Sequence, residues 1–428
     1  MRVLFVHPND VGVSGGTIAM HRLRNGLRDA GHPSQILCVD RQLPAEESVL
    51  IPAPALVRAG ESLLRPLTIR AGFNDLHRLG SFLVPGLPAY QAADVIDLHC
   101  MHGAYFNFLS LPRLTRRKPA VITLHDMWPV TGHCAFSLDC GKYATGCGDC
   151  PYPDTFPAVW RDNTHAEWTM KRWAYRRSAV AAVAPSLWLA RAAMAGPFRG
   201  LPVYHIPYGV NTTTYRPAAA DRDAVGLPKD RLLILAAAAS ISRDTRDRKG
   251  GDLLMAALAA LPEELRRRST LVVMGRADET FLRAAPLEAI ALGYVREDAK
   301  KAAIYAAVDC MVCSTRADNL PLVILESLAS GTPVAAFGVG GVGEAVREGI
   351  TGALAAPEDS QSLARAIERV LTHPAADEMR RSCRSVAEAE YDIALQVHRT
   401  VSLYGSLVAQ LGARGRLDPH VAVPAGQA

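Results

Sequence analysis

The segment with the clearest chemical potential reads DNLPLVILESLASGTP and runs from Asp318 to Pro333. Asp318 or Asn319 is predicted to cap a helix that has Pro321 in its first turn. The free N–H groups of such a helix start can hold a phosphate. Glu326 falls on the largely apolar part of this helix, where a carboxylate is unfavourable unless it is paired. The two vicinal hydroxyls of a ribose would pair with it, and the alternative is a Glu on a solvent-facing helix surface.

A second segment, Ser240–Gly250, reads SISRDTRDRKG and concentrates cations directly after the apolar run Leu232–Ala239. Guanidinium and ammonium groups at the end of a strand can neutralise a diphosphate. The alternative is a solvated charged loop. The position at a strand end favours phosphate binding by the cations of this loop, which are Arg243, Arg246, Arg248 and Lys249.

Two shorter signals lie in the N-terminal half. Gly15 and Gly16 precede a helix-like segment and follow the apolar run Arg2–His7. Paired glycines let backbone N–H groups approach an anion, although a tight turn without a ligand fits equally. His125 follows another apolar run in the sequence TLHD and could donate a hydrogen bond or act as a general acid or base. A structural histidine that bonds to loop carbonyls is the alternative.

The segment 133–150 holds a cluster of cysteines, Cys134, Cys140, Cys147 and Cys150, with the spacing C-x5-C-x6-C-x2-C. Four thiolates this close can form a structural zinc site, and C-x2-C is a common half-site. His133 could replace one cysteine. A disulfide pair or plain reduced thiols are the alternatives, and a catalytic metal is not expected here.

These candidate residues follow strand-like runs that alternate with helix-like segments along the whole chain. This alternation predicts parallel sheets covered by helices. The pattern starts again after Pro207, so an α/β architecture of two Rossmann-like, doubly wound domains facing across a cleft is expected. Ligands of such sheets bind at the carboxyl ends of the strands, where the candidate residues lie.

The expected domain boundaries follow from the hinge-like stretch PYGVNTTTYRP at Pro207–Pro217. An N-terminal domain is predicted over 1–210, with the Cys-rich insert at 133–150, and a C-terminal domain is predicted over 211–392. A helix over 393–412 is expected to cross back to the N-terminal domain, and 413–428 is expected to form a tail.

Composition excludes several classes of protein. With 49% hydrophobic and 21% charged residues the chain is neither disordered nor fibrous, and its apolar runs are too short to span a membrane. The N-terminus reads as a strand rather than a signal peptide, so a cytoplasmic location with reduced thiols is expected. No basic run with interleaved aromatics indicates nucleic-acid binding.

Charge is distributed unevenly. Residues 1–217 hold 22 Lys and Arg against 15 Asp and Glu, whereas residues 218–428 hold 25 against 27. The positive half could face an anionic membrane surface or acceptor, and a solvated basic surface is the alternative. Three arginines near Trp168 and Trp173 form either an interfacial helix or a helix packed on its own domain.

Taken together and in this order, the motifs resemble the retaining glycosyltransferases of family 4, which have the GT-B fold. The segments that carry the resemblance are Gly15–Gly16, Ile206–Pro217, Arg243 with Lys249–Gly250, Asp318 with Glu326, Gly331–Val334 and Gly340–Glu344. The stretch HDMWPVTGHC, the later CGDC and the DNLP motif resemble the branch associated with exopolysaccharide and colanic-acid-type assembly. Asp318 departs from the family pattern, which has Glu at this position.

The resemblance implies that the domain over 1–210 lies on the acceptor side and that the domain over 211–392 binds the nucleotide-sugar. It also implies a role for each matching position. Glu326 would hold the donor ribose, and Arg243 and Lys249 would neutralise the departing diphosphate. Asp318 would contact the transferred sugar or the phosphates, His125 would lie near the reacting centre, and Gly15–Gly16 would pass close to the diphosphate. The backbone of residues 319–322 would also contact the donor through Asn319, Leu320, Pro321 and Leu322.

The resulting expectation is a retaining enzyme that uses a nucleoside-diphosphate sugar and no catalytic cofactor. Its acceptor would be a glycan, lipid-linked, in bacterial surface polysaccharide biosynthesis at the inner face of the cell membrane. A nucleotide-sugar epimerase or phosphorylase on the same fold, or a non-catalytic nucleotide-sugar-binding subunit, are the alternatives. The donor base and sugar, the acceptor and the oligomeric state cannot be read from the sequence.

Overall fold

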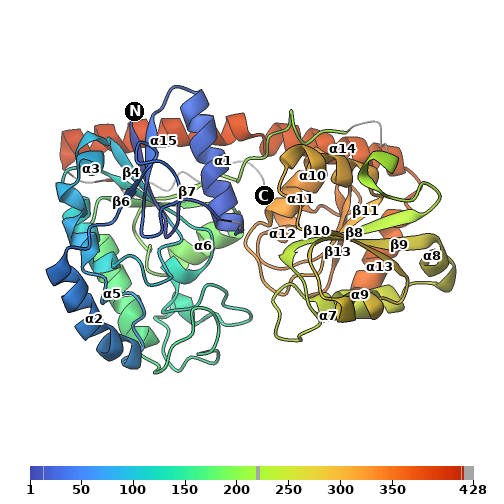
Figure 1. Cartoon of the computed structure of the whole chain (residues 1–428), viewed down its shortest axis with the longest axis horizontal. Helices are drawn as coiled ribbons and strands as arrows, with labels where there is room; N and C mark the ends of the chain where they lie inside the picture. The colour runs from blue at the N-terminus through green and yellow to red at the C-terminus, as the bar shows by residue number, and fades with distance from the viewer. Residues whose placement is uncertain (13, 218–221, 416, 419–428) are drawn as a thin grey trace. The chain divides into compact units, whose positions relative to one another are not determined.

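The computed structural model describes residues 1–12, 14–217, 222–415 and 417–418. The chain forms two compact units (Figure 1). The first combines Met1–Pro207 with the C-terminal segment from Val397, and the second is Tyr208–Gln396. Most of the predicted tail, 413–428, lies outside the described residues.

The first unit is built on a seven-stranded parallel sheet with the order β3-β2-β1-β4-β5-β6-β7. Most of its strands are short runs of apolar residues, and β1 and β4 are buried along their whole length, as expected of a sheet covered on both faces. The strands are β1 Val3–Val6, β2 Ser34–Cys38, β3 Ser48–Leu50, β4 Val95–His99, β5 Ala120–Thr123, β6 Val180–Ala184 and β7 Val203–His205.

The second unit repeats the same winding with a six-stranded parallel sheet of order β10-β9-β8-β11-β12-β13. In both sheets the chain leaves the central strand in one direction and returns to its other side, which creates a topological switch point there. The strands are β8 Leu232–Ser240, β9 Ser269–Arg276, β10 Glu288–Gly293, β11 Cys310–Cys313, β12 Val334–Phe337 and β13 Gly352–Ala355. The prediction of two doubly wound α/β domains is confirmed.

Helices cover the sheets, and Figure 1 shows α10 and α11 on one side of the second sheet and α7 and α13 on the other. The helices of the first unit are α1 Gly15–Asp29, α2 Ala55–Arg70, α3 Pro88–Ala92, α4 Leu111–Leu114, α5 Thr164–Arg176 and α6 Leu187–Ala195. Those of the second are α7 Gly251–Ala259, α8 Glu263–Arg268, α9 Glu279–Arg283, α10 Asp298–Ala307, α11 Leu322–Ala329, α12 Val342–Ala345, α13 Ser360–Leu371 and α14 Ala376–Glu390. In the described part of the chain, no helix is long and apolar enough to cross a membrane.

The final helix, α15 Ile393–Arg414, joins the first unit from Val397 onward. Leu403, Tyr404 and Leu407 are buried there. The Tyr404 hydroxyl donates a hydrogen bond to Oδ2 of Asp97 on β4. A polar contact inside an apolar core has a defined geometry, so this bond fixes the position of α15 on the sheet.

Candidate functional site

The second unit brings two predicted segments together at the switch point of its sheet. The loop after β8 carries Lys249, and the loop after β11 carries Asp318. Lys249 Nζ lies 2.9 Å from Oδ2 of Asp318, and Nη1 of Arg248 lies 2.7 Å from the same oxygen. The structure therefore gathers two cations and one carboxylate where ligands of such sheets bind.

The charges of this cluster influence one another. Burial alone would raise the pKa of Asp318, but Lys249 and Arg248 outweigh it and lower the pKa to about 2. Asp318 is therefore ionised at neutral pH. One carboxylate cannot neutralise two cations, so the cluster keeps a net positive charge that can attract a phosphate.

Two glycines allow the loops to approach this closely. Gly250 has φ +64°, and a Cβ there would lie 2.1 Å from the carbonyl oxygen of Ser314. Gly340, in the loop after β12, has φ +56°, and its Cβ would lie 1.9 Å from the carbonyl oxygen of Asp318. A larger residue at either position would push apart the loops that hold the cation cluster.

The predicted cap of the helix after β11 is wrong. Helix α11 begins at Leu322, with Pro321 at the N-cap position and no side-chain cap. Asp318 instead accepts from Arg248 and Lys249, and from the backbone N–H of Asn319 at 3.0 Å. Two nearby cations hold the carboxylate more strongly than backbone N–H groups would. Of the predicted backbone positions, the structure buries the side chains of Asn319, Leu320 and Leu322.

Glu326 lies on α11 with only 4% of its surface exposed. Its Oε2 accepts a hydrogen bond of 3.0 Å from the hydroxyl of Tyr305 on α10. The carboxylate is thus buried and paired by the protein, as a carboxylate among apolar residues requires. Its predicted contact with a ribose stays a prediction.

Arg243 lies on the exposed part of the loop after β8. Arg248, five residues later, is the arginine that contacts Asp318. The sequence identified the cation-rich loop correctly but could not indicate which of its arginines turns inward, because that depends on how the loop folds against Ser314 and Arg316.

In the first unit, loops after β1, β4 and β5 meet at the switch point of that sheet. Gly16, in the first turn of α1, packs so closely that a Cβ would lie 2.7 Å from Cys100 Sγ and 3.3 Å from Cγ of His125. Gly15 has open space around it. The predicted residues Gly16 and His125 are therefore neighbours, and glycine is required for that contact.

His125 is half-buried and contacts a series of buried polar groups. Its Nε2 lies 2.7 Å from Nδ1 of His99, and Nε2 of His99 lies 3.2 Å from Oδ1 of Asp97 without the alignment of a hydrogen bond. Asp97 also accepts from Thr123 and from Tyr404 of α15. Burial, with His99, His7 and His102 nearby, lowers the pKa of His125 well below its usual value. His125 is therefore neutral at physiological pH and suited to donate or accept a hydrogen bond.

A second pair of polar residues, His102 and Asp126, lies beside these groups. Nε2 of His102 is 2.8 Å from Oδ2 of Asp126. Burial would lower the pKa of His102, but Asp126 outweighs it and the pKa is raised. Cys100, His102 and Asp126 are, among the described residues, the one trio whose potential metal-ligand atoms all lie within 4.8 Å of one another. The ion pair between two members accounts for their closeness.

Sequence reasoning missed His99, His102 and Asp97. A signal was present, because the stretch DLHCMH spans the end of strand β4 just as TLHD spans the end of β5. Polar residues after neighbouring parallel strands meet at one edge of the sheet.

Protein stability is expected to fall as the pH drops below about 6.5, the ordinary pKa of histidine. Burial lowers the pKa of His7 from 6.5 to about 4, and it lowers that of His125 well below its usual value. The unfolded chain then binds more protons than the folded one, and His7 alone would account for about 3 kcal/mol by pH 4. Urea unfolding at pH 7.5, 6 and 4.5 would measure this. His7→Gln should flatten the profile, and an unchanged profile in that variant would contradict the assignment.

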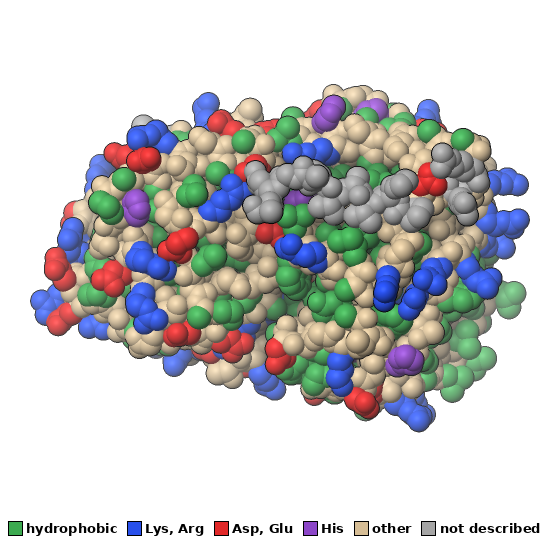
Figure 2. Space-filling view, turned by 180° about the vertical axis from the view of Figure 1, so that it is seen from behind, with side chains coloured by type: hydrophobic (Ala, Val, Ile, Leu, Met, Phe, Trp, Pro, Cys, Tyr) green, Lys and Arg blue, Asp and Glu red, His purple; other side chains and the backbone are tan. Residues whose placement is uncertain are grey.

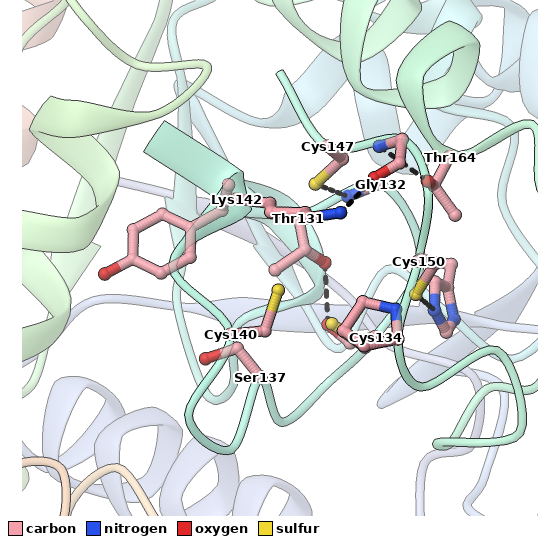
Figure 3. A pocket seen from close by; sticks show the side chains of 13 residues that line it. Thr131, Gly132, Cys134, Ser137, Cys140, Lys142, Cys147, Cys150 and Thr164 are labelled. Carbon is pink, nitrogen blue, oxygen red and sulfur yellow. Dashed lines mark hydrogen bonds between the residues drawn. The ribbon is translucent and has the colours of Figure 1, made fainter. Parts of the chain in front are cut away.

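The four clustered cysteines line one small pocket in the first unit, together with His133 (Figure 3). All four are free thiols in the structure. Burial raises the pKa of Cys134 to about 12 and that of Cys147 to about 11. The pocket lies on the segment 131–163. This 33-residue connection follows the 3₁₀ turn Trp128–Val130 and leads into α5.

Comparison with known families gives two matches. Residues 13–214 match the model described as Glycosyltransferase Family 4, and residues 236–373 match the model described as Glycosyl transferases group 1. The first range covers Gly16 and His125, and the second covers Lys249, Asp318 and Glu326.

Two curated relatives are similar over part of the chain. One is "Putative colanic acid biosynthesis glycosyl transferase WcaC" of Escherichia coli K12, 29% identical over 284 residues that cover 62% of this chain and 63% of the relative. The other is "D-inositol 3-phosphate glycosyltransferase" of Streptosporangium roseum, 32% identical over 182 residues, or 39% of this chain and 41% of the relative. The chain thus spans less than two thirds of the length of these relatives.

Solved structures share the fold at low sequence identity. Sucrose-phosphate synthase from Thermosynechococcus elongatus aligns with a TM-score of 0.68 and 18% identity, covering 95% of this chain and 99% of that one. HepE from Anabaena, solved in complex with UDP and glucose, aligns with a TM-score of 0.64 and 18% identity. The alignment covers 95% of this chain and 100% of the HepE chain.

Proposed function

The chain belongs to the family 4 and group 1 glycosyltransferases, and from this premise we propose that it transfers a sugar from a nucleoside-diphosphate sugar to a glycan acceptor. The observation that carries the proposal is the net positive cluster of Lys249 and Arg248 around Asp318 at the switch point of the second sheet. One relative is named as a putative colanic acid biosynthesis glycosyl transferase, and bacterial surface polysaccharide is the proposed product class.

The proposed chemistry places the barrier at the departing diphosphate. As the bond between the sugar and the diphosphate breaks, negative charge grows on the phosphate oxygens. Lys249 and Arg248 are fixed by hydrogen bonds before the reaction, so they stabilise that charge without reorganising. Arg243, on the same loop, is proposed to reach the diphosphate when the donor is bound.

We further propose that the configuration at the sugar is retained. The acceptor hydroxyl would attack from the face that the diphosphate leaves, and a leaving phosphate oxygen would take its proton. Asp318 is already engaged by two cations, which makes a covalent intermediate on this carboxylate less favourable. Its proposed role is to orient Lys249 and Arg248 and to contact the transferred sugar.

Nucleotide binding offers the direct test of this function. We expect one of UDP, GDP, ADP and dTDP to raise the melting temperature, because a ligand at about 100 times its Kd stabilises a protein by about 2.7 kcal/mol. UDP is tested first, since HepE was solved with UDP. Glu326→Gln keeps the bond to Tyr305 within reach but loses the charge that would hold the ribose, so the shift should shrink.

The matched control is Glu264→Gln, a mostly exposed glutamate of α8 in the same unit, which should leave the shift unchanged. A melting temperature that responds to NAD alone, or to no nucleotide in either protein, would overturn the proposed donor site.

We propose a lipid-linked acceptor at an anionic membrane, contacted through α2 of the first unit. This helix buries none of its residues, and Leu56, Leu63 and Leu67 are 84%, 73% and 62% exposed. Figure 2 shows apolar side chains, with Lys and Arg nearby, along the edge of the unit where α2 lies in Figure 1. A row of exposed leucines is unusual on a surface that contacts only water.

The charges around α2 indicate what covers it. Arg58 and Arg65 are exposed on the helix, whereas its one carboxylate, Glu61, turns inward to Arg78 and to the backbone N–H of Gly80. An exposed Trp160 lies by the C-terminal turn, in a hollow with Arg65 and Arg70. Leucines flanked by arginines, with a tryptophan at the border, fit an anionic lipid surface.

The interfacial helix considered from the sequence around Trp168 and Trp173 stays a prediction, since Trp173 is 46% exposed. In the structure, α5 buries Trp168, whose Nε1 donates to the carbonyl of Tyr143, so that side chain packs on its own domain.

Replacing Leu63 and Leu67 of α2 with Glu is expected to lower binding to anionic vesicles at least about tenfold, because each lost apolar contact costs more than 1 kcal/mol. Sedimentation with phosphatidylglycerol-containing vesicles would measure it, and phosphatidylcholine vesicles should bind less. Ile350→Glu, at an exposed apolar residue of the second unit, is the control. Equal loss in both variants, or no binding by the unmodified protein, would contradict the proposal.

A further inference from the structure

The connection that holds the clustered cysteines buries few apolar side chains of its own. Of its apolar side chains, Ala135 and Val159 are buried near its two ends, while Leu138 and Phe156 between them are 45% and 58% exposed. One short 3₁₀ turn, Lys142–Ala144, is its regular structure between these positions. Long irregular segments with so little apolar burial are commonly held by a metal or by disulfides.

The cysteines surround a space of suitable size. The pocket has room of about 20 Å³, close to that of one water molecule, and its wall includes all four cysteines (Figure 3). Cys134 and Cys140 precede the 3₁₀ turn Lys142–Ala144, and Cys147 and Cys150 follow it. All four line the pocket, so one bound ion would join the two sides of the turn.

The polar groups next to the sulfurs suit a thiolate site. The backbone N–H of Gly132 donates to Cys147 Sγ at 3.2 Å. His133 is 2% exposed, and its Nδ1 lies 3.0 Å from the carbonyl oxygen of Pro157. A carbonyl can only accept, so Nδ1 carries the proton, and Nε2 accepts from the Cys150 thiol, whose Sγ is 3.2 Å away in the structure. A histidine fixed in this way is typical of metal sites.

We propose that Cys134, Cys140, Cys147 and Cys150 bind one structural Zn²⁺ as thiolates, with His133 beside Cys150. In the structure no three of these ligand atoms lie within 4.8 Å of one another, since the Cys100 trio is the one such group in the described ranges. Cysteine has a single side-chain torsion, and rotation about it moves the sulfur while the backbone stays in place. Binding therefore replaces four S–H bonds with four Zn–S bonds and releases four protons.

The ion would also stabilise the segment that follows His125. The backbone N–H of Met127 donates to the carbonyl of Ala135 at 2.9 Å, and the Ser137 hydroxyl lies 3.0 Å from Met127 Sδ. The metal-held connection thus packs against the residue two positions after His125. This link to catalysis rests on the proposed glycosyltransferase function, whereas zinc binding does not.

The test is the metal content of the full chain purified without chelator, measured by mass spectrometry of the metal. We expect about one Zn²⁺ per chain. Cys140→Ser and Cys147→Ser should lose it, while Cys383→Ser, at a buried cysteine outside the cluster, should keep it. Limited proteolysis after treatment with a chelator should cut between 136 and 158.

A second measurement covers the case in which the serine variants do not fold. Unmodified protein loaded with Co²⁺ should show thiolate-to-cobalt charge-transfer bands and the visible bands of tetrahedral cobalt. A metal-free protein with four reactive thiols, or a disulfide within the cluster found by peptide mass analysis, would overturn the proposal. Either result leaves nucleotide binding by the second unit unaffected, so the two proposals fail separately.

Discussion

Lys249→Ala is expected to lower kcat/KM for sugar transfer by about 10²–10³, the usual effect of removing one fixed donor from a developing anion. Lys249 Nζ is held 2.9 Å from Asp318 and is the ammonium group of the cluster. Removing it leaves Asp318 paired with Arg248 alone, so the net positive charge of the cluster disappears. Steady-state kinetics with the donor identified by thermal shift would measure the loss.

Arg246→Ala is the matched control for this prediction. Arg246 is a cation of the same loop, but its side chain is 91% exposed and faces Asp244. Its loss should change kcat/KM less than about twofold, as surface ion pairs contribute little. Similar losses in both variants would mean that the loop acts only through its overall charge. Arg243→Ala then shows whether the exposed arginine of the family pattern reaches the donor.

His125→Ala is expected to lower kcat by about 10²–10⁴, the range for loss of a positioned proton donor or acceptor. The side chain is half-buried and lies 2.7 Å from the buried His99, which in turn approaches Asp97. Alanine would remove the group and leave His99 without its partner. His398→Ala, on the exposed face of α15, is the control and should retain activity.

The pH profile separates catalysis from support of the fold. In the unmodified protein His125 is neutral, so activity should persist well below pH 6.5. Asp97→Asn should move the acid limb of the kcat profile, because the charge that faces His99 is lost. If His125→Ala lowers the melting temperature but leaves kcat unchanged, His125 is a structural residue.

Much of the architecture could be predicted from the sequence because parallel strands buried on both faces are continuous apolar runs. Leu232–Ala239 and β8 agree within one residue, and Ile393 is the first residue of the predicted and the observed final helix. The loops that carry Lys249 and Asp318 could also be located, since each follows such a run. Their contact follows from the sheet order, which local sequence does not reveal.

The side-chain partners could not be predicted. From the sequence, Asp318 could equally well cap a helix or pair with cations. Only the fold shows two cations within 3 Å of its carboxylate. Helix α2 was missed for a different reason. Its leucines point to solvent, so the usual rule that apolar residues mark the core gives no correct assignment there.

Because α15 completes the first unit, the order of synthesis matters for this protein. The two partners Asp97 and Tyr404 are 307 residues apart in the chain. At ribosomal rates of 5–20 residues per second, Tyr404 emerges roughly 15–60 s after Asp97. During that time the apolar surface of the first unit that buries Leu403 and Leu407 is uncovered, and the second unit can fold first. A nascent chain of this protein therefore leaves the surface that α15 covers on the first unit exposed to chaperones until α15 leaves the ribosome.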